Sequence, residues 1–507
     1  MERIGIIDLG SNSIRLVIIQ ISENGAHYQK ENLKETVRLV DSTDKDGMLS
    51  QEAMDYAVET VKLFVSFCQA QRVEKIIAVA TAATRRASNQ KAFIRRLKNE
   101  TGLNFQVLSG EQEAHLGYIG TVNTIGQSSG LMVDLGGGSI KLVSIANRLK
   151  GMSNNLPFGA VTLTNQFQTK DQPTAENLAN LENYLMDQFK EMPWLEGEGP
   201  IIGVGGSFRS LARVVRKEKE YVPDITDGFE MTLEDVEYQF DRLAKMTLAE
   251  RLQVPGLEHS RADIMIAGVA TIKCLLKASN RSKIVVSTTS IRDGLLYQYL
   301  NRYTNDPIVL SVITHHIDNL INYYNLEETH LRKVSNLAVT IFDQLHRVHG
   351  LNAHARRLLL IASLLHEIGV VVGVESRNKH TLYMLLNAPL YGLNHRERVI
   401  VAYIAASHDG MHLVNLDEYI EKGPLLPEDA ELIEKLAVIL QIAHSLDRCQ
   451  TGSVSQVRVG IEDNICNLRI IARTSADLEI KDALRKADDF EKVFKHQLLM
   501  SQSPITV

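Results

Sequence analysis

Two stretches of the chain share the same pattern of apolar and polar positions. They read IGIIDLGSNSIRLVII (residues 4–19) and GLMVDLGGGSIKLVSI (residues 130–145). Each has an apolar run, a short turn of Gly, Ser or Asn, and a second apolar run, a pattern typical of two antiparallel strands joined by a tight turn. The sequence therefore predicts two β-hairpins that form one internal repeat.

The aligned hairpins carry the same chemistry at matching positions. Asp8 aligns with Asp134, and Arg15 aligns with Lys141. The turns have few side-chain atoms, so their backbone N–H groups can approach an anion closely. The Asp before each turn can hold a hydrated cation, and the Arg or Lys after it adds positive charge. One such hairpin could be an ordinary turn, but a matching pair that face each other would bind phosphate.

The rest of the first three hundred residues alternates between strand-like and helix-like segments, which is typical of an α/β protein. Helical spacing is clear in residues 50–71, where Ala57, Val61 and Phe64 share one face. Other expected helices cover 174–191 and 261–276, and expected strands cover 26–36, 76–80 and the starts of 201–214 and 285–300.

Helical patterns predominate after about residue 303. Helices are predicted over 330–345 and 356–369, and the chain closes with strand-like runs at 454–461 and 465–473 and a helix over 481–498. We therefore expect four domains, with the bounds 1–125, 126–302, 303–450 and 451–507.

Composition limits the classes of partner. The chain has 507 residues, 44% of them hydrophobic and 23% charged, as in soluble proteins of three or four domains. Its net charge of −6 gives no overall attraction to nucleic acid or anionic membranes, so a polyanion would need local basic patches. The four cysteines form no Cys-x-x-Cys pair and suggest a reducing, cytoplasmic location. We expect no signal peptide, because the first residues run straight into a strand that contains Asp8. We expect no membrane insertion, because the apolar runs are too short to span a bilayer.

Two further motifs follow predicted strands. Residues 80–87 read ATAATRRA, which places Thr81 and Arg85 after a strand, and SGEQEA places Glu113 in the first turn of a helix. Together with the hairpins, these segments resemble the Ppx/GppA family of exopolyphosphatases and guanosine-pentaphosphate phosphatases, within the acetate kinase–sugar kinase–Hsp70–actin superfold. Gln112 stands where the family pattern Ser-Gly-x-Glu-Glu-Ala has its first Glu.

The resemblance implies an α/β fold of two actin-like (ribonuclease H-like) lobes around a cleft, followed by an all-α HD-like domain and a small α+β segment. It implies Glu113 as the catalytic base, and Mg²⁺ near Asp8 and Asp134, held through waters. The implied phosphate-binding residues are Gly10, Ser11, Asn12, Ser13, Arg15, Arg85, Gly136, Gly137, Gly138, Ser139 and Lys141. Arg261 and Arg292, whose segments also match the family, either line the cleft or form structural ion pairs, and of these two we expect the ion pairs.

The order of His330, His366-Glu367 and Asp447 resembles an HD-type phosphohydrolase domain, which binds metal through His, His-Asp and a distant Asp. Glu367 stands where the Asp belongs. Because Glu is one methylene longer, we expect its carboxylate to miss a ligand position that must be held within about half an ångström. The prediction is a vestigial metal site in a structural or substrate-guiding domain. His380 and His408 lie between these residues in the sequence.

These features predict an exopolyphosphatase that processively removes the terminal phosphate of inorganic polyphosphate. The alternative substrate is guanosine pentaphosphate, which ends in the same group, and the helical half favours polyphosphate because a long chain needs a surface to follow. A non-enzymatic sensor of polyphosphate or alarmone is a further alternative. An actin-like kinase is disfavoured by the Glu113 motif. The resemblance also implies a homodimer.

Overall fold

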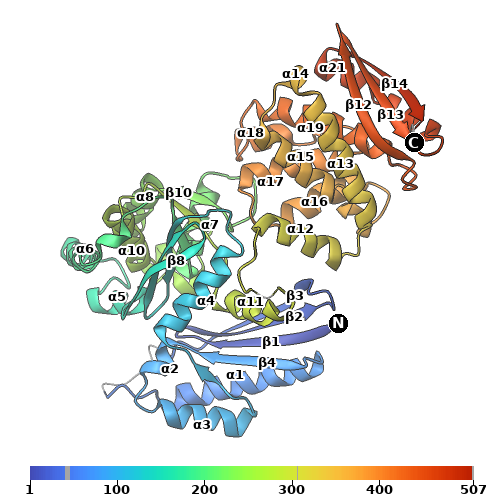
Figure 1. Cartoon of the computed structure of the whole chain (residues 1–507). Coiled ribbons are helices and arrows are strands. Elements are labelled where there is room, and N and C mark those ends of the chain that lie inside the picture. The colour runs from blue at the N-terminus through green and yellow to red at the C-terminus, as the bar shows by residue number, and fades with distance from the viewer. Residues whose placement is uncertain (40–45, 305, 505–507) are drawn as a thin grey trace. The chain divides into compact units, whose positions relative to one another are not determined.

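The computed structural model describes residues 1–39, 46–304 and 306–504. The chain forms two compact units, Met1–Val312 and Ile313–Val507 (Figure 1). Within this division the four expected domain bounds stay a proposal. In the described ranges, no helix is both long enough and apolar enough to cross a membrane.

The first lobe is built on a five-stranded sheet with the order β3-β2-β1-β4-β5. Strands β1, β2 and β3 form an antiparallel meander, and β4 and β5 add in parallel. The strands are β1 (Glu2–Leu9), β2 (Ser13–Ile21), β3 (His27–Thr36), β4 (Lys75–Ala80) and β5 (Gln106–Val107). The helices are α1 (Gln51–Ala70), α2 (Ala82–Arg86), α3 (Gln90–Thr101) and α4 (Gly110–Val122). Ala57, Val61 and Phe64 of α1 pack into the core, as the helical spacing predicts.

The second lobe repeats this arrangement. Its sheet has the order β10-β11-β9-β6-β7-β8, in which β6, β7 and β8 are the antiparallel meander and β9 and β11 add in parallel. The strands are β6 (Gly130–Leu135), β7 (Ile140–Ala146), β8 (Leu149–Leu156), β9 (Ile201–Val204), β10 (Glu230–Thr232) and β11 (Lys283–Val286). The longer helices are α5 (Ala160–Phe167), α6 (Ala175–Lys190), α7 (Gly206–Glu218), α8 (Leu233–Ala244), α10 (Met265–Ala278) and α11 (Ile291–Thr304), and a short helix α9 covers Leu248–Arg251. The matching strand orders confirm the expected pair of actin-like lobes.

Helix α4 links the lobes, because it packs against α11 and against the meander β6–β8 of the second sheet. Two glycines allow the α4–α11 approach. A Cβ on Gly294 would overlap the Leu116 carbonyl oxygen, and one on Gly120 would lie 3.0 Å from that of Ser290. A larger residue at 294 would force the two helices apart, so this position fixes the distance between α4 and α11.

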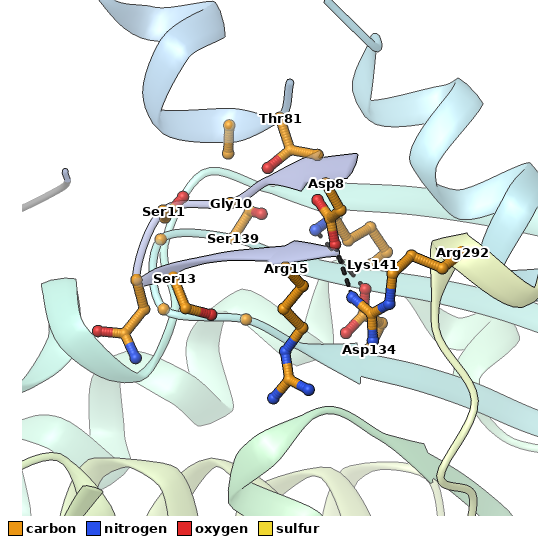
Figure 2. Close-up of a pocket in the computed structure, with 15 residues that line it drawn as sticks. Asp8, Gly10, Ser11, Ser13, Arg15, Thr81, Asp134, Ser139, Lys141 and Arg292 are labelled. Carbon is orange, nitrogen blue, oxygen red and sulfur yellow. Dashed lines mark hydrogen bonds and ion pairs between the residues drawn. The ribbon is translucent and has the colours of Figure 1, made fainter. Parts of the chain in front are cut away.

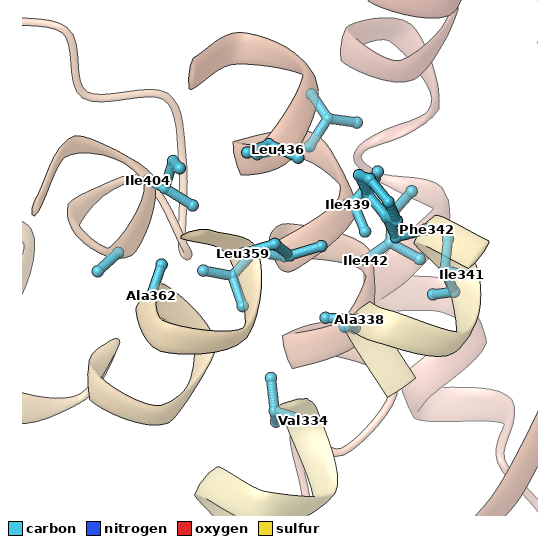
Figure 3. Packing of buried hydrophobic residues seen from close by; sticks show 14 of the residues in the cluster. Val334, Ala338, Ile341, Phe342, Leu359, Ala362, Ile404, Leu436, Ile439 and Ile442 are labelled. Atoms are coloured by element: carbon cyan, nitrogen blue, oxygen red, sulfur yellow. The ribbon is translucent and has the colours of Figure 1, made fainter. Parts of the chain in front are cut away.

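The second unit is a helical bundle. Its helices are α12 (Val312–Tyr323), α13 (Glu328–Gln344), α14 (His346–His349), α15 (Ala353–Leu365), α16 (Arg377–Asn387), α17 (His395–Ala406), α18 (Leu416–Glu421) and α19 (Asp429–Ser445). Figure 3 shows the core that α13, α15, α17 and α19 share, with Ala338, Ala362, Ile404 and Ile439 among its members. Small residues on α13 and α15 let these helices approach closely at the centre of the bundle.

The chain ends in a three-stranded sheet with the order β12-β13-β14 and two short helices. These elements are β12 (Val454–Glu462), β13 (Ile465–Ala472), α20 (Asp477–Leu484), α21 (Ala487–Phe494) and β14 (Gln497–Pro504). The small α+β segment is therefore as expected, but the single helix predicted over 481–498 is wrong. The chain turns after Leu484, and residues 497–504 pair in parallel with β13 instead.

Two predicted helices have different ends in the structure. The helix predicted over 261–276 begins at Met265, and Arg261 lies in a single 3₁₀ turn before it. The helix predicted over 356–369 ends at Leu365, so Glu367 lies outside it with φ −96° and ψ 8°. Apolar spacing alone could not detect this end, because Ile368 continues the apolar pattern and is also buried.

Candidate active site

The two hairpins have the same local geometry. Asp8 pairs in register with Arg15 on β1 and β2, and Asp134 pairs with Lys141 on β6 and β7. The backbone N–H at the start of each turn donates to the carbonyl oxygen at its end, at 3.1 Å in the first hairpin and 3.0 Å in the second. The sequence repeat is thus a structural repeat.

Both turns line a single cavity of about 150 Å³ between the lobes (Figure 2). Most of the residues expected to bind phosphate or metal are among its walls. The lining residues are Asp8, Gly10, Ser11, Asn12, Ser13, Arg15, Thr81, Ala82, Asp134, Gly136, Gly137, Gly138, Ser139, Lys141 and Arg292. None of these fifteen residues is aromatic, and their polar groups suit a compact, strongly charged ligand.

Glu113 and Arg85 are not among the lining residues, but each is linked to them through contacts. The Glu113 carboxylate is buried at the start of α4, where its Oε2 lies 2.7 Å from Lys141 Nζ. Its Oε1 accepts a hydrogen bond from Arg85, whose guanidinium also donates to the Leu108 carbonyl oxygen at 2.6 Å. The expected base is therefore held between two cations, one of which reaches the cavity.

The carboxylates of the two hairpins differ in their partners. Asp8 Oδ2 lies 2.8 Å from Arg292 Nη1, whereas Asp8 Oδ1 is buried and has no hydrogen-bond partner among the described residues. Asp134 Oδ2 lies 3.7 Å from Lys141 Nζ. Burial raises the pKa of Asp8, although Arg292 opposes that shift. An unpartnered buried carboxylate oxygen that faces a polar cavity fits an oxygen-liganded cation such as Mg²⁺.

The pKa values of Lys141 and Arg15, the cations of the two hairpins, are shifted in opposite directions. Burial by itself would lower the pKa of Lys141, but Asp134 and Glu113 outweigh that effect and raise it. The pKa of Arg15 is instead lowered by burial and by the positive charge of Arg292. The first hairpin therefore has an excess of positive charge, and the second has its cation neutralised by carboxylates.

Three further arginines lie near the cavity, and one of them, Arg209, was not singled out from the sequence. Arg292 forms the expected ion pair, with Asp8, yet it also lines the cavity. Arg261 lies 3.7 Å from Glu258, and its guanidinium fills the space beside Gly206 at the start of α7. Burial and the charges of Arg261, Arg15 and Arg292 lower the pKa of Arg209 to about 10. Its place just after the Gly203–Gly206 turn is the signal that could have revealed Arg209.

The residues expected for the vestigial metal site also meet, within the helical unit. His330 Nδ1 lies 2.8 Å from Asp447 Oδ2, and His330 Nε2 lies 3.8 Å from Glu367 Oε1. His444, which was not expected from the sequence, joins His330, His366 and Glu367 in one group, whereas His380 does not. His444 precedes Asp447 by one helical turn, and that spacing is the signal that could have revealed it. Burial and the neighbouring imidazoles hold the pKa of His366 and that of His444 well below the usual range.

Comparison with known proteins agrees with this arrangement. A model of the Ppx/GppA phosphatase family matches residues 17–303, and one of Ppx/GppA phosphatase domain III matches residues 312–488. A crystal structure of the Aquifex aeolicus member of this family matches at 27% sequence identity with a TM-score of 0.53. A crystal structure of an exopolyphosphatase from Cytophaga hutchinsonii matches at 27% sequence identity with a TM-score of 0.56. Each match covers 59% of this chain and 98% of the other. The first family model matches more than half of the residues of this chain. The chain therefore belongs to the Ppx/GppA phosphatase family.

Proposed function

We propose that this protein is an exopolyphosphatase, which hydrolyses the terminal phosphoryl group of inorganic polyphosphate and releases orthophosphate. The observation that carries this proposal is the position of Glu113. A buried carboxylate bridges Arg85 and Lys141, and Lys141 lines the cavity formed by both glycine-rich turns. Phosphoryl transfer to water needs a base, donors for phosphate oxygens and positive charge, and these residues can supply all three.

The turns would hold the end of the phosphate chain. The backbone N–H groups of residues 10–13 and 136–139, with the hydroxyls of Ser13 and Ser139, can donate to phosphate oxygens. Lys141 and Arg85 would then move part of their contact from Glu113 to the terminal phosphoryl group. That exchange would free a Glu113 oxygen for a water molecule.

Glu113 would orient this water and accept its proton as the water oxygen attacks the terminal phosphorus. The bond between that phosphorus and the bridging oxygen breaks, and the shortened chain leaves with the negative charge on its new end. Arg85, Arg15 and Lys141 would offset the charge of the transferred group. Asp8, through its unpartnered Oδ1, and Asp134 would hold Mg²⁺, which when bound supplies further neutralisation of phosphate charge.

Positive charge beside the cavity supports polyphosphate as the substrate. Arg209 and Arg261 add positive charge near the first hairpin, which suits further phosphates of a chain. Guanosine pentaphosphate ends in the same phosphoryl group and remains the second candidate. The homodimer implied by the family and the cytoplasmic location suggested by the cysteines stay predictions, to be checked by solution mass and cell fractionation.

The decisive experiment measures phosphate release from polyphosphate, guanosine pentaphosphate and ATP side by side, with Mg²⁺ present. We expect the largest kcat/KM on polyphosphate and almost none on ATP. A larger kcat/KM on guanosine pentaphosphate would reverse the choice of substrate. Tight binding of polyphosphate without any release would favour the sensor over the enzyme.

A further inference from the structure

Four buried histidines meet at the centre of the helical unit. His330 lies on α13, His366 directly follows α15, His408 follows α17, and His444 lies in the last turn of α19. We call these four residues the histidine cluster. The same four helices supply the apolar core in Figure 3, so the packing that builds the bundle also fixes the imidazoles.

The rings are close enough for their nitrogens to share one ligand. The ring centroids of His330 and His444 are 5.6 Å apart, those of His366 and His444 5.1 Å, and those of His408 and His444 5.0 Å. Nitrogen atoms of His330, His366 and His444 and a carboxylate oxygen of Glu367 all lie within 4.8 Å of one another. Adjacent ligands of one metal ion are about 3 to 3.5 Å apart when each bond is near 2.1 Å, so small side-chain shifts would complete such a site.

Hydrogen bonds on the outer side of three rings aim their other nitrogens inward. His330 Nδ1 bonds to Asp447 Oδ2 at 2.8 Å, His366 Nδ1 to the Ser363 carbonyl oxygen at 2.7 Å, and His408 Nδ1 to that of Ala405 at 2.7 Å. Each acceptor requires a proton on Nδ1, which leaves the Nε2 lone pair free.

Two of these lone pairs are orphaned. His330 Nε2 and His408 Nε2 are buried and have no hydrogen-bond partner among the described residues. Buried polar atoms almost always have a partner, because leaving one without a hydrogen bond destabilises the fold. The orphaned nitrogen of His330, beside the imidazole of His366, indicates a missing electron-pair acceptor, which is what a metal cation provides.

In His444, unlike the other three histidines, both ring nitrogens form hydrogen bonds to other side chains. Its Nε2 accepts a hydrogen bond from Arg448 at 2.9 Å, so its Nδ1 carries the proton and donates to His366 Nε2 at 3.1 Å. To bind a cation through Nδ1, His444 must move that proton to Nε2, and Arg448 must turn away. Arg448 already lies 3.2 Å from Asp409 Oδ1 and is partly exposed, so it has another partner.

The end of α15 explains how Glu367 can serve in place of Asp. The sequence suggested that its longer side chain would miss the ligand position. However, α15 ends at Leu365, and the backbone of Glu367 is no longer helical. The shifted backbone brings Oε1 to 3.8 Å from His330 Nε2.

We propose that His330, His366, His444 and Glu367 bind one divalent first-row transition-metal ion, such as Zn²⁺ or Fe²⁺, with His408 beside it. Three imidazole nitrogens and one carboxylate are typical of such ions, whereas Mg²⁺ prefers oxygen ligands and retained waters. Four protein ligands in a buried setting are typical of a closed, structural site. The ion stabilises the junction of the four helices.

The test uses the untagged, full-length protein purified without added metal. Elemental analysis should find about one equivalent of transition metal per chain, and X-ray absorption at that metal's edge should show the multiple scattering of imidazole ligands. Removing the metal with a chelator should lower Tm by several degrees, and adding Zn²⁺ should restore it.

Variants locate the site. His366→Ala and the milder Glu367→Gln should each lose most of the metal, whereas His349→Ala should keep it. His349 is a matched control, because it is a buried histidine of the same unit whose ring nitrogens both bond to the backbone. The proposal fails if wild-type protein holds less than about a tenth of an equivalent and gains no visible Co²⁺ absorption bands on Co²⁺ addition. It also fails if both variants keep the metal. If His366→Ala does not fold, the wild-type X-ray absorption spectrum and the metal content of Glu367→Gln still test whether the metal is bound at this site.

Discussion

The hairpin formed by β1 and β2 and the hairpin formed by β6 and β7 have the same register and the same turn hydrogen bond, but different ionic partners. In the first, Asp8 pairs with Arg292, and Arg15 lies among other cations. In the second, Lys141 lies between Asp134 and Glu113. A duplicated backbone has thus acquired two electrostatic environments.

This difference indicates a division of labour. The turns bind phosphate oxygens alike, because that depends on backbone geometry. The base makes its direct hairpin contact with Lys141 of the second hairpin, since α4 packs on the sheet of the second lobe. We therefore expect changes at the second hairpin to act mainly on kcat, and changes at the first mainly on KM.

The largest effect should come from Glu113→Gln. The amide keeps the shape of the side chain but cannot accept the water proton, so kcat should fall by roughly two to four orders of magnitude. Steady-state kinetics on a short polyphosphate, with a binding measurement as control, checks this. A variant that keeps more than about a third of the wild-type rate would remove Glu113 from the role of base.

Lys141→Met and Arg15→Met compare the two cations directly. A hydrogen bond to a charged group contributes about 1.5–3 kcal/mol, so Lys141→Met should lower kcat roughly 10- to 100-fold. Arg15→Met should raise KM more than it lowers kcat. The double variant Glu113→Gln, Lys141→Met should lose less than the product of the single losses. Equal kcat effects at the two positions would contradict the division of labour.

Ser139→Ala and Ser13→Ala make a milder comparison. Ser139 is 3% exposed, whereas Ser13 is only half-buried. If the hydroxyl at position 139 is removed, the phosphate oxygen that it would have bonded has less access to water than its counterpart at position 13. We expect a loss in kcat/KM of about tenfold for Ser139→Ala and a smaller loss for Ser13→Ala, because exposure to water weakens a hydrogen bond's net contribution. The reverse order, measured on the same substrate, would show that burial does not decide their contributions.

A protein ending at Val312 tests whether the two hairpins suffice. Asn123 and Arg148 contact the backbone of residues 307–310, so an earlier end near Tyr303 would remove contacts of the first unit. The rate on short chains should stay within about threefold of wild type, because remote contacts add binding energy rather than chemistry. Long chains should be degraded less processively, as gel analysis of the products would show. Unchanged processivity would assign long-chain binding to the first unit alone.

The smallest effect concerns an ion pair next to the first hairpin. Lys34, which lies opposite Arg15 in register, contacts Glu258 of the second lobe at 2.6 Å. Burial would raise the pKa of Glu258, but Lys34 and Arg261 outweigh it and lower that pKa to about 2. The depressed pKa stabilises the fold above about pH 4.3, the ordinary value for Glu, and this contribution is lost as the pH falls toward 2.

Glu258→Gln should therefore lower Tm at pH 7 by at most about 2 °C, because the pair is partly exposed. The difference from wild type should shrink as the pH falls below about 4. Thermal unfolding across this pH range measures it. A difference that stays constant with pH would mean that the loss comes from packing rather than charge.

The sequence by itself determined the two hairpins, the strand–helix alternation, the helical second half and most of the cavity lining. These features depend on local rules: alternation at period two, helical spacing, and Gly-rich turns whose repetition made them recognisable. These local rules did not predict the end of α15, because the apolar pattern continues past Leu365. They also did not predict β14, because this strand forms only by pairing with β13.

Only the tertiary structure decided which charges meet. Asp8 and Arg292 are 284 residues apart, and Lys141 meets Glu113 because α4 packs on the second lobe. His444 joined the histidine cluster for the same reason, since its ring faces His366 across two packed helices. Local sequence sets which groups are available, but the strength of an ion pair or a metal site depends on distances of a few ångströms, which long-range packing fixes.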